Sequence, residues 1–497
     1  MATGTMRSAV QRLFWGGLAG KLLGLVREVL LAAAYGTGAP AVAARVAQTA
    51  TLVPVDLVTA DALSAGFLPV HAGLRRHDPA RAAALFHALR AVLLVLALAV
   101  TAALLLLAGR VVDLLAPGLD AGTAATAATF LRVMALGLPS YLQFALLSYL
   151  EASHGSFRLS SARPTAQNTG MVTGLLVAWW LSAPVALAWG FPAAYVALHA
   201  WAHLSLRRRG VLPPPRWERS AARDALAQLW RRVRPLLLLP LVLQSSVVAE
   251  RVVASLLGDG VVAAVDYARF VATTGVSLLA VPLGLAGLAV LPELSAPDAR
   301  ERLERLVPAV LVVVAPLSAL LAVEAGGVVQ VLYGRGAFDA AAVAASAQVL
   351  TGFAVGFWAQ ALSYVLVKAL NARDRNRAAV TALVAGLALT LVVDLTLPAV
   401  LGPVALGLAV SAGAVVTTAL AARSLGLGPV LVRSAARCAP GALLAALAAA
   451  LAGAAVPGAW AGLVLGSAAA LAVWCAHVAC VPALRRAVVG VLRSSRP

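Results

Sequence analysis

The sequence has few charged residues and very few cysteines. Only 12% of its 497 residues are charged and 62% are hydrophobic, whereas a soluble domain is about a quarter charged and about half apolar. The three cysteines, Cys438, Cys475 and Cys480, are odd in number and lack the spacing of metal ligands. The composition therefore excludes an ordinary soluble domain, and it predicts an all-α polytopic membrane protein without a disulfide framework.

The sequence also lacks the motifs of the common enzymes. It contains no GxSxG, HExxH or Walker A pattern, and its seven histidines are scattered. We therefore expect a transporter without catalytic residues, a bound metal or a cofactor. The net charge of +19 is explained by arginine-rich cytoplasmic loops, so we expect no nucleic acid as a partner.

Hydropathy predicts about fourteen transmembrane segments. When the N-terminus is placed in the cytoplasm, most arginines fall in inside loops, and an even number of segments returns the C-terminus to the same side. We therefore expect both termini to be cytoplasmic. The segments lie near residues 12–35, 41–67, 86–108, 124–150, 166–182, 184–205, 235–257, 260–291, 306–325, 341–369, 377–399, 402–422, 438–456 and 459–481.

An internal repeat predicts two lobes of six helices each. A segment end with a proline, followed by a turn containing Asp, Pro, Ala and Arg, occurs at residues 67–81 and again at residues 290–300. The intervening loop has apolar residues at helical spacing and predicts an amphipathic helix on the inner membrane surface; a solvated linker is the alternative. The predicted divisions are 1–206 (first lobe), 207–234 (linker), 235–423 (second lobe) and 424–497 (two further helices and a cytoplasmic tail).

Charged residues inside the first two segments mark a candidate binding chamber. Lys21 and Arg27 lie in the first segment, where a charge costs a few kcal/mol unless it faces water or a partner. Two cations there predict a chamber that receives an anion, although Lys21 can also reach the inner interface. Arg45 adds a third cation in the second segment.

Buried carboxylates are candidates for a coupling-ion site or for charge pairs. Glu28 follows Arg27, and an internal pair with either cation is the simpler interpretation. Glu250 and Asp394 lie in later apolar segments, where a carboxylate must be protonated, paired or bound to a cation. An ion such as Na⁺ or H⁺ and a structural pair with arginine both remain open. The second segment also contains Asp56 and Asp61.

Four stretches resemble the MurJ/MviN lipid II flippase family of the multidrug/oligosaccharidyl-lipid/polysaccharide exporter superfamily. The resemblance covers nearly the whole chain, and its patterns are specific in combination. The stretches are KLLGLVREVLLAAAYGTG (21–38), FLPVHAGL (67–74), ERVVASLLGDGVVAAVDYARF (250–270) and LYGRGAFD (332–339).

The resemblance implies a two-lobed bundle that alternates between inward and outward openings of a central cavity. Its expected substrate is an undecaprenyl-pyrophosphate-linked saccharide, moved across the bacterial cytoplasmic membrane. The cavity cations of the family match Lys21, Arg27 and Arg269, and guanidinium groups bind phosphate oxygens in a bidentate manner. The last two helices would form a groove for the lipid tail, and cell-wall synthesis proteins are possible partners.

The second segment departs from the family pattern. An arginine pair expected there aligns with Val55 and Asp56, and Arg45 appears about ten residues earlier. Alternative functions are therefore export of another polyprenyl-linked oligosaccharide, drug or cation antiport within the superfamily, and a non-transporting role as a cell-wall scaffold. A basic chamber favours an anionic substrate over a cationic drug.

Overall fold

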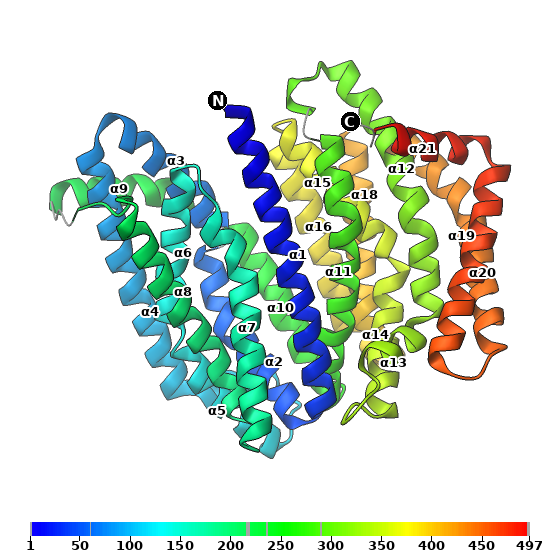
Figure 1. The fold of residues 1–497 in the computed structure, drawn as a ribbon, viewed down its shortest axis with the longest axis horizontal. Coiled ribbons are helices and arrows are strands. Elements are labelled where there is room, and N and C mark those ends of the chain that lie inside the picture. The colour runs from blue at the N-terminus through cyan, green and yellow to red at the C-terminus, as the bar shows by residue number, and fades with distance from the viewer. Residues whose placement is uncertain (1, 60, 215–218, 235–236, 289–290, 495–497) are drawn as a thin grey trace. The chain divides into compact units, whose positions relative to one another are not determined.

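The computed structural model describes residues 2–59, 61–214, 219–234, 237–288 and 291–494. This part of the chain is helical and contains no strand. Close packing divides the chain into two compact units, Met1–Asp259 and Gly260–Pro497. Figure 1 shows the helices of the first unit in blue to green and those of the second in green to red.

The first unit contains ten helices in its described residues. Four of them contain an internal proline that removes a backbone hydrogen bond: Pro54 in α2, Pro69 in α3, Pro164 in α7 and Pro192 in α8. The helices are α1 (Ala2–Tyr35), α2 (Ala39–Thr59), α3 (Asp61–His77), α4 (Pro79–Leu115), α5 (Ala121–Ala135), α6 (Leu138–Ser153), α7 (Arg158–Trp180), α8 (Ala186–Arg208), α9 (Arg219–Val233) and α10 (Leu238–Leu256).

Small residues let α1 and α7 approach closely within this unit. Gly16 and Gly20 are four residues apart, and a Cβ added to them would lie 2.5 Å from the Ser161 carbonyl oxygen and 2.4 Å from Pro164 Cβ. Glycines at this spacing are typical of membrane helix pairs, which associate by close packing rather than by a hydrophobic driving force. The contact places the start of α7 beside the cation-bearing part of α1.

The second unit begins with α11 and ends with a transverse helix. Its elements are α11 (Asp259–Leu288), η2 (Leu291–Glu293), α12 (Ala296–Val323), α13 (Ala325–Tyr333), α14 (Ala340–Val355), α15 (Phe357–Ala372), α16 (Asn376–Thr396), α17 (Pro398–Leu401), α18 (Val404–Ser424), α19 (Gly428–Ala454), α20 (Ala459–Cys480) and α21 (Pro482–Ser494).

The predicted segments all coincide with helices or with broken pairs of helices. The pairs α5 and α6, and α14 and α15, bend by 46° and 50° at their breaks. Of the described helices, eight are long and apolar enough to cross a membrane, or up to ten if each bent pair is one span. The protein is therefore a multi-pass membrane protein, while the predicted number of about fourteen crossings stays a prediction.

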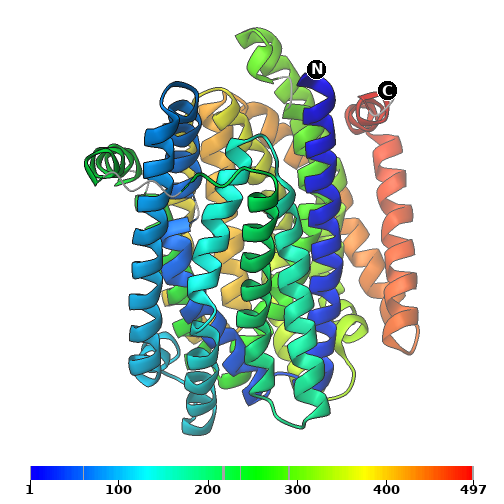
Figure 2. The same ribbon diagram turned by 60° about the vertical axis from the view of Figure 1, so that its left-hand side comes forward.

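Two amphipathic helices lie across the long helices. Figures 1 and 2 show α9 and α21 roughly perpendicular to the helices of their own units. In α9 the buried residues Ala225, Leu229 and Val233 face the unit, and Trp230 is exposed. A helix therefore occupies residues 219–233 of the predicted linker, packed on α3 and α4; its position at a membrane surface remains a prediction.

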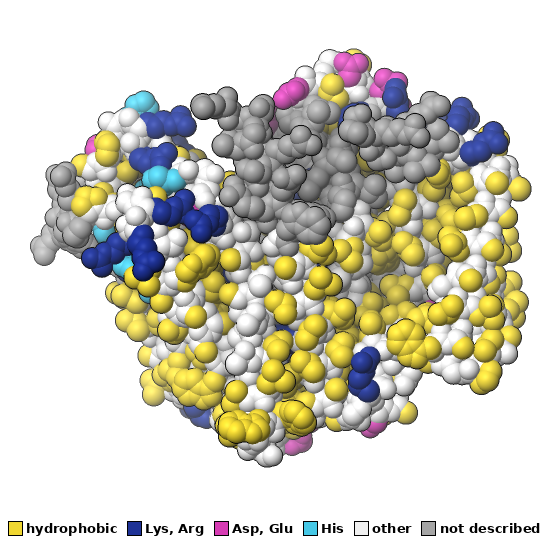
Figure 3. Space-filling view, in the orientation of Figure 1, with side chains coloured by type: hydrophobic (Ala, Val, Ile, Leu, Met, Phe, Trp, Pro, Cys, Tyr) yellow, Lys and Arg dark blue, Asp and Glu magenta, His cyan; other side chains and the backbone are white. Residues whose placement is uncertain are grey.

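The surfaces of both units have the polarity expected in a bilayer. Large apolar side chains are exposed along the spans, including Trp180, Leu106, Val400 and Leu443. Figure 3 shows hydrophobic side chains over most of each unit and Lys and Arg gathered near one end of each. Lipid contact explains these exposed residues, because hydrocarbon does not penalise apolar surface.

The division of the chain by packing differs from the predicted lobes. The sequence predicts that the linker at residues 207–234 separates the lobes. The two compact units instead divide between Asp259 and Gly260. The reason is that α10 packs on α2 and α4 of the first unit. The lobes defined by the internal repeat stay a prediction.

Candidate substrate-binding site

The first two helices hold a buried charge cluster in the first unit. The Arg27 Nη2 atom lies 2.5 Å from Glu28 Oε1, and the Arg45 guanidinium donates to both carboxylate oxygens of Glu28, with Nη1 3.2 Å from Oε1. The Glu28 side chain is 1% exposed and that of Arg45 is 7% exposed. One carboxylate thus holds two guanidinium groups from two helices.

Within the contacts of the described residues, the cluster has more cations than carboxylates. A buried ion pair is balanced only when its hydrogen bonds offset the loss of hydration, and here a single carboxylate faces two cations. Lys21 precedes Glu28 by seven residues, or about 10 Å along the helix. It is half-buried on α1. The arrangement attracts an anion, and phosphate oxygens are suited to it because guanidinium groups form paired charge-assisted bonds with them.

A second polar network in this unit was not anticipated from the sequence. Arg163 on α7 donates from Nη2 to the Tyr141 hydroxyl at 2.6 Å and from Nε to the Tyr195 hydroxyl at 3.3 Å. Tyr141 in turn donates to Asp56 Oδ1 at 3.4 Å, and Tyr195 donates to Gln167 Oε1 at 2.9 Å. The network joins α2, α6, α7 and α8.

The sequence contained one signal for this network. Arg163 precedes the segment predicted near residues 166–182, whereas it lies in the second turn of α7. Gln167 and Asn168 follow at helical spacing before the apolar run of the same helix. Polar side chains that recur every four residues at the start of a span indicate a helix face directed towards other polar groups.

Near the end of α6, a buried histidine and a buried carboxylate connect the helices. His71 Nδ1 lies 3.1 Å from the Ser153 hydroxyl, and burial, with smaller contributions from His154 and Arg75, lowers the pKa of His71 to about 4. Glu151, 1% exposed, accepts from Arg209 Nη1 at 2.6 Å and from the Leu159 backbone at 2.8 Å. These contacts stabilise the α6–α7 connection.

Just beyond the C-terminal end of α4, the backbone of one aspartate contacts the side chain of another. The Asp120 side chain caps α5 by accepting from the Gly122 and Thr123 backbones at 2.7 and 3.0 Å. Asp259 Oδ2 accepts from the Asp120 backbone at 3.4 Å. Hydrogen bonds with Asp259 and Thr123 hold the pKa of Asp120 below its ordinary value.

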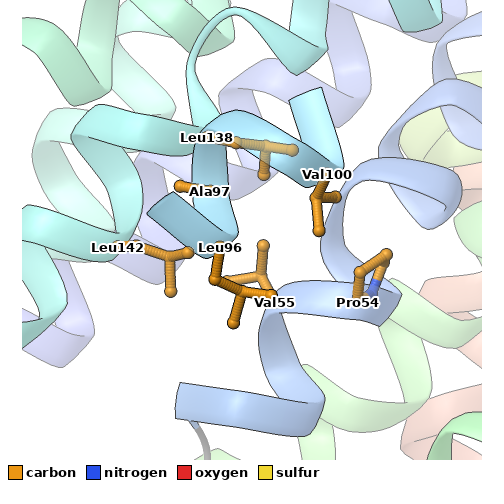
Figure 4. A pocket seen from close by; sticks show the side chains of 7 residues that line it. All are labelled: Pro54, Val55, Leu96, Ala97, Val100, Leu138 and Leu142. Atoms are coloured by element: carbon orange, nitrogen blue, oxygen red, sulfur yellow. The ribbon is translucent and has the colours of Figure 1, made fainter. Parts of the chain in front are cut away.

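An apolar pocket in the first unit carries no polar group that would bind a substrate. Figure 4 shows its lining side chains between α2, α4 and the start of α6. It lies beside the proline of α2, where the helix loses a backbone hydrogen bond. The lining residues are Pro54, Val55, Leu96, Ala97, Val100, Leu138 and Leu142.

The second unit holds the remaining candidates. The Arg269 guanidinium lies 5.6 Å from the centre of the Phe353 ring, a cation–π geometry. Asp394 is fully buried on α16, which packs on α18 through Gly386 and Gly413.

The structure brings three of the predicted site residues into contact, and the grouping of the others stays a prediction. Arg27, Glu28 and Arg45 form one cluster. Glu250 is buried on α10 and belongs to the first unit, whereas Asp394 belongs to the second. The side chain of Asp61 lies outside the described residues. A shared cavity for Lys21, Arg27, Arg45 and Arg269 remains a prediction.

Comparison with known proteins identifies the family. The family model described as "Lipid II flippase MurJ" matches residues 32–476, which is most of the chain. The chain belongs to the lipid II flippase MurJ family. A curated relative, the "Probable lipid II flippase MurJ" of Synechocystis, is 29% identical over 377 residues, covering 71% of this chain and 69% of that protein.

Solved structures share the MurJ fold. A lipid II flippase MurJ in an inward closed conformation is similar with a TM-score of 0.84 at 14% identity, covering 94% of this chain and 98% of that one. An inward-facing MATE family transporter of the MOP superfamily has a TM-score of 0.62 at 12% identity, covering 85% of this chain and 95% of that one. At these identities the likeness concerns the fold.

Family membership changes no residue of the candidate site, and it places the chain among flippases. The family model is named for a lipid II flippase. In the described residues, no group of three or more His, Cys, Asp or Glu side chains is arranged to hold a metal.

Proposed function

We propose that this protein translocates lipid II across the bacterial cytoplasmic membrane by alternating access. The observation that carries the proposal is the buried Arg27–Glu28–Arg45 cluster, in which two guanidinium groups share one carboxylate. Family membership supplies the substrate class, and the cluster supplies a reason for binding a diphosphate.

The cluster binds the substrate when the diphosphate replaces Glu28 as the partner of the arginines. The diphosphate of the lipid-linked saccharide takes the place of Glu28 at one or both arginines, and Lys21 adds a further positive charge from the same helix. A phosphate forms paired hydrogen bonds with a guanidinium as a carboxylate does, so the exchange keeps the buried donors satisfied. By the family resemblance, Arg269 of the second unit is a further cation for the diphosphate.

The energy source is either an ion or the membrane potential. Glu28, Asp61, Glu250 and Asp394 are the carboxylates that a Na⁺ ion or a proton would use. The membrane potential supplies about 2.3 kcal/mol for each elementary charge moved through 100 mV. Both termini lie in the cytoplasm, as the arginine-rich connections require, and cell-wall synthesis proteins are the expected neighbours.

Export of another polyprenyl-linked oligosaccharide is the second candidate. It is favoured by the second helix, where Asp56 occupies a position at which the family resemblance leads to an arginine. Such a substrate shares the diphosphate, so Arg27 and Arg45 would act in the same way, and only the sugar contacts would differ.

Arg45→Ala and Arg27→Ala test the proposal in proteoliposomes. We expect each to reduce lipid II translocation at least about tenfold, because each removes a charge-assisted contact to phosphate. The readout is the fraction of labelled lipid II reaching the opposite leaflet, compared with another undecaprenyl-diphosphate-linked glycan.

Arg132→Gln is the matched control. Arg132 also lies in an apolar helix of the first unit, but it is exposed, and among the described residues its guanidinium donates to the Leu105 carbonyl oxygen at 3.4 Å. The Arg132→Gln variant should translocate lipid II at the wild-type rate. Wild-type translocation rates in both Arg27→Ala and Arg45→Ala would refute the assignment of the site. If the wild-type protein transports the other glycan but not lipid II, the second candidate function is supported.

A further inference from the structure

The hydrogen-bonding capacity of Tyr141 determines how Asp56 and Arg163 are linked. A phenol hydroxyl has one hydrogen to donate and lone pairs to accept. Arg163 donates to the Tyr141 oxygen at 2.6 Å, so the single hydrogen of Tyr141 is available for Asp56 Oδ1 at 3.4 Å. Asp56 therefore accepts from Tyr141. When Asp56 is ionised, the relay joins a negative to a positive charge through one hydroxyl.

The second phenol anchors Arg163 from the other side. Tyr195 accepts from Arg163 Nε at 3.3 Å and passes its own hydrogen to Gln167 at 2.9 Å. The Arg163 guanidinium also lies 5.0 Å from the centre of the Tyr141 ring. Asp56 supplies the negative charge that balances the cation, since Tyr141, Tyr195 and Gln167 are uncharged.

Close packing places Arg163 at the level of Lys21. A Cβ on Gly20 would lie 2.4 Å from Pro164 Cβ, and Asn168 Nδ2 donates to the Gly20 carbonyl oxygen at 2.9 Å. Gly20 precedes Lys21 and Pro164 follows Arg163. The cation of α7 is thus one residue from the point where α7 touches the cation-bearing stretch of α1.

We propose that Asp56 is a proton-dependent positioning residue for the transport reaction. Ionised Asp56 balances the charge of Arg163 through Tyr141. Protonation of Asp56 removes that negative charge, so Arg163 turns to the substrate diphosphate beside Lys21 as its new counter-charge. The proton comes from bulk water and returns to it when the anion leaves. This inference rests on the proposed function, because it assigns Arg163 to the same diphosphate.

Few groups interact with the Asp56 carboxylate. The groups that act on it are Tyr141 of α6, Arg163 of α7 and Tyr195 of α8. Within the described residues, none of the other helices packed on α2, namely α1, α3, α4, α5 and α10, contributes a charged group that acts on it. Protonation of Asp56 therefore changes the net charge of the network from zero to plus one.

The pH dependence of lipid II binding tests the proposal. We expect the affinity of the wild-type protein in nanodiscs to rise as the buffer becomes mildly acidic. Asp56→Asn removes the titrating group, so this variant should bind at basic pH about tenfold more tightly than wild type and lose the pH dependence. Tenfold is the change expected from one charge-assisted bond to phosphate.

Arg163→Gln should bind weakly at every pH, because the released donor is missing. Glu151→Gln is the control, since Glu151 is also a buried carboxylate paired with an arginine in this unit, and it should keep the wild-type slope. A wild-type slope in Asp56→Asn would overturn the proposal, and so would an unchanged affinity in Arg163→Gln protein that elutes as a monodisperse peak.

An infrared difference titration tests the relay without a substrate. Wild-type protein should gain a protonated-carboxyl band on acidification that Asp56→Asn lacks. If the band is absent from the difference between the two proteins, the relay is refuted. If the band is present but wild-type protein binds no lipid II at any pH, the proposed function fails while protonation of Asp56 stands.

Discussion

At the scale of single residues, the buried charges of this protein are organised in pairs and networks rather than as isolated ions. Glu28 holds two arginines, Glu151 holds Arg209, and Arg163 is held by two phenols. Removing one partner of such a group typically costs about 3–5 kcal/mol, because the other charge is left buried and unpaired. A transport site built in this way must exchange one set of partners for another.

His71 makes the stability of the protein depend on pH. Its pKa in the fold is about 4, against 6.5 when exposed, so the neutral form is the one that fits. Stability is therefore complete above about pH 6.5 and falls by up to about 3 kcal/mol as the pH approaches 4. The unfolding temperature in detergent, measured across this range, should follow this course.

His71→Gln is the control for that titration, because the amide keeps a polar group near Ser153 and does not titrate. Its unfolding temperature should change less than that of wild type between neutral and acidic buffer. If both proteins lose stability equally, His71 is not the group responsible.

At the scale of secondary-structure elements, close approach of helices through glycine is what holds the spans together. In the second unit, a Cβ added to Gly386 of α16 would lie 2.1 Å from Thr417 Oγ1 and 2.6 Å from the Gly413 carbonyl oxygen of α18. Backbone atoms cannot move aside as a flexible side chain can, so α16 and α18 must separate to admit a methyl group.

Gly386→Ala should therefore destabilise the second unit by about 1–3 kcal/mol, in spite of the better helix propensity of alanine. Thermal unfolding in detergent measures the change. Gly109→Ala is the control, because a Cβ at Gly109 in α4 meets nothing within 4 Å. An equal or higher unfolding temperature for Gly386→Ala than for wild type would contradict the close approach.

At the scale of the whole molecule, the arrangement of charge predicts the orientation in the membrane. The segment after Asp394 contains no acidic residue, and its arginines lie at the inner ends of the predicted spans and in the tail. The positive-inside rule therefore places the C-terminus in the cytoplasm. A fluorescent protein fused to the C-terminus should fluoresce, and alkaline phosphatase fused there should be inactive.

The same pair of reporters fused after residue 336, in the predicted outside loop, is the internal control and should give the reverse result. Active phosphatase at the C-terminus would mean that the number of crossings is odd. Such a result would overturn the predicted topology while leaving the fold unchanged.

Local sequence was sufficient for most of the helices and for singling out several buried or half-buried charges. Apolar runs predict spans because a bilayer requires every backbone group to bond within its own helix. Lys21, Arg27 and Arg45 were recognised because a charge within an apolar run is costly and needs an explanation. Arg163 was missed because its neighbours Ser160 and Pro164 are typical of a loop, and only packing against α1 and α8 makes that stretch helical.

The helical class of the protein and its apolar spans follow from composition, since hydrophobicity and length are properties of the chain alone. The partners of the charged residues depend on which helix faces meet, and those contacts join positions far apart in sequence, as Glu28 joins Arg45 and Asp56 is linked to Arg163 through Tyr141. Hydropathy does not predict such contacts, because their energy depends on distance and burial in three dimensions. The sequence by itself thus determined that this is a helical membrane protein with charges inside its apolar segments, and the tertiary structure decided which carboxylate contacts which arginine.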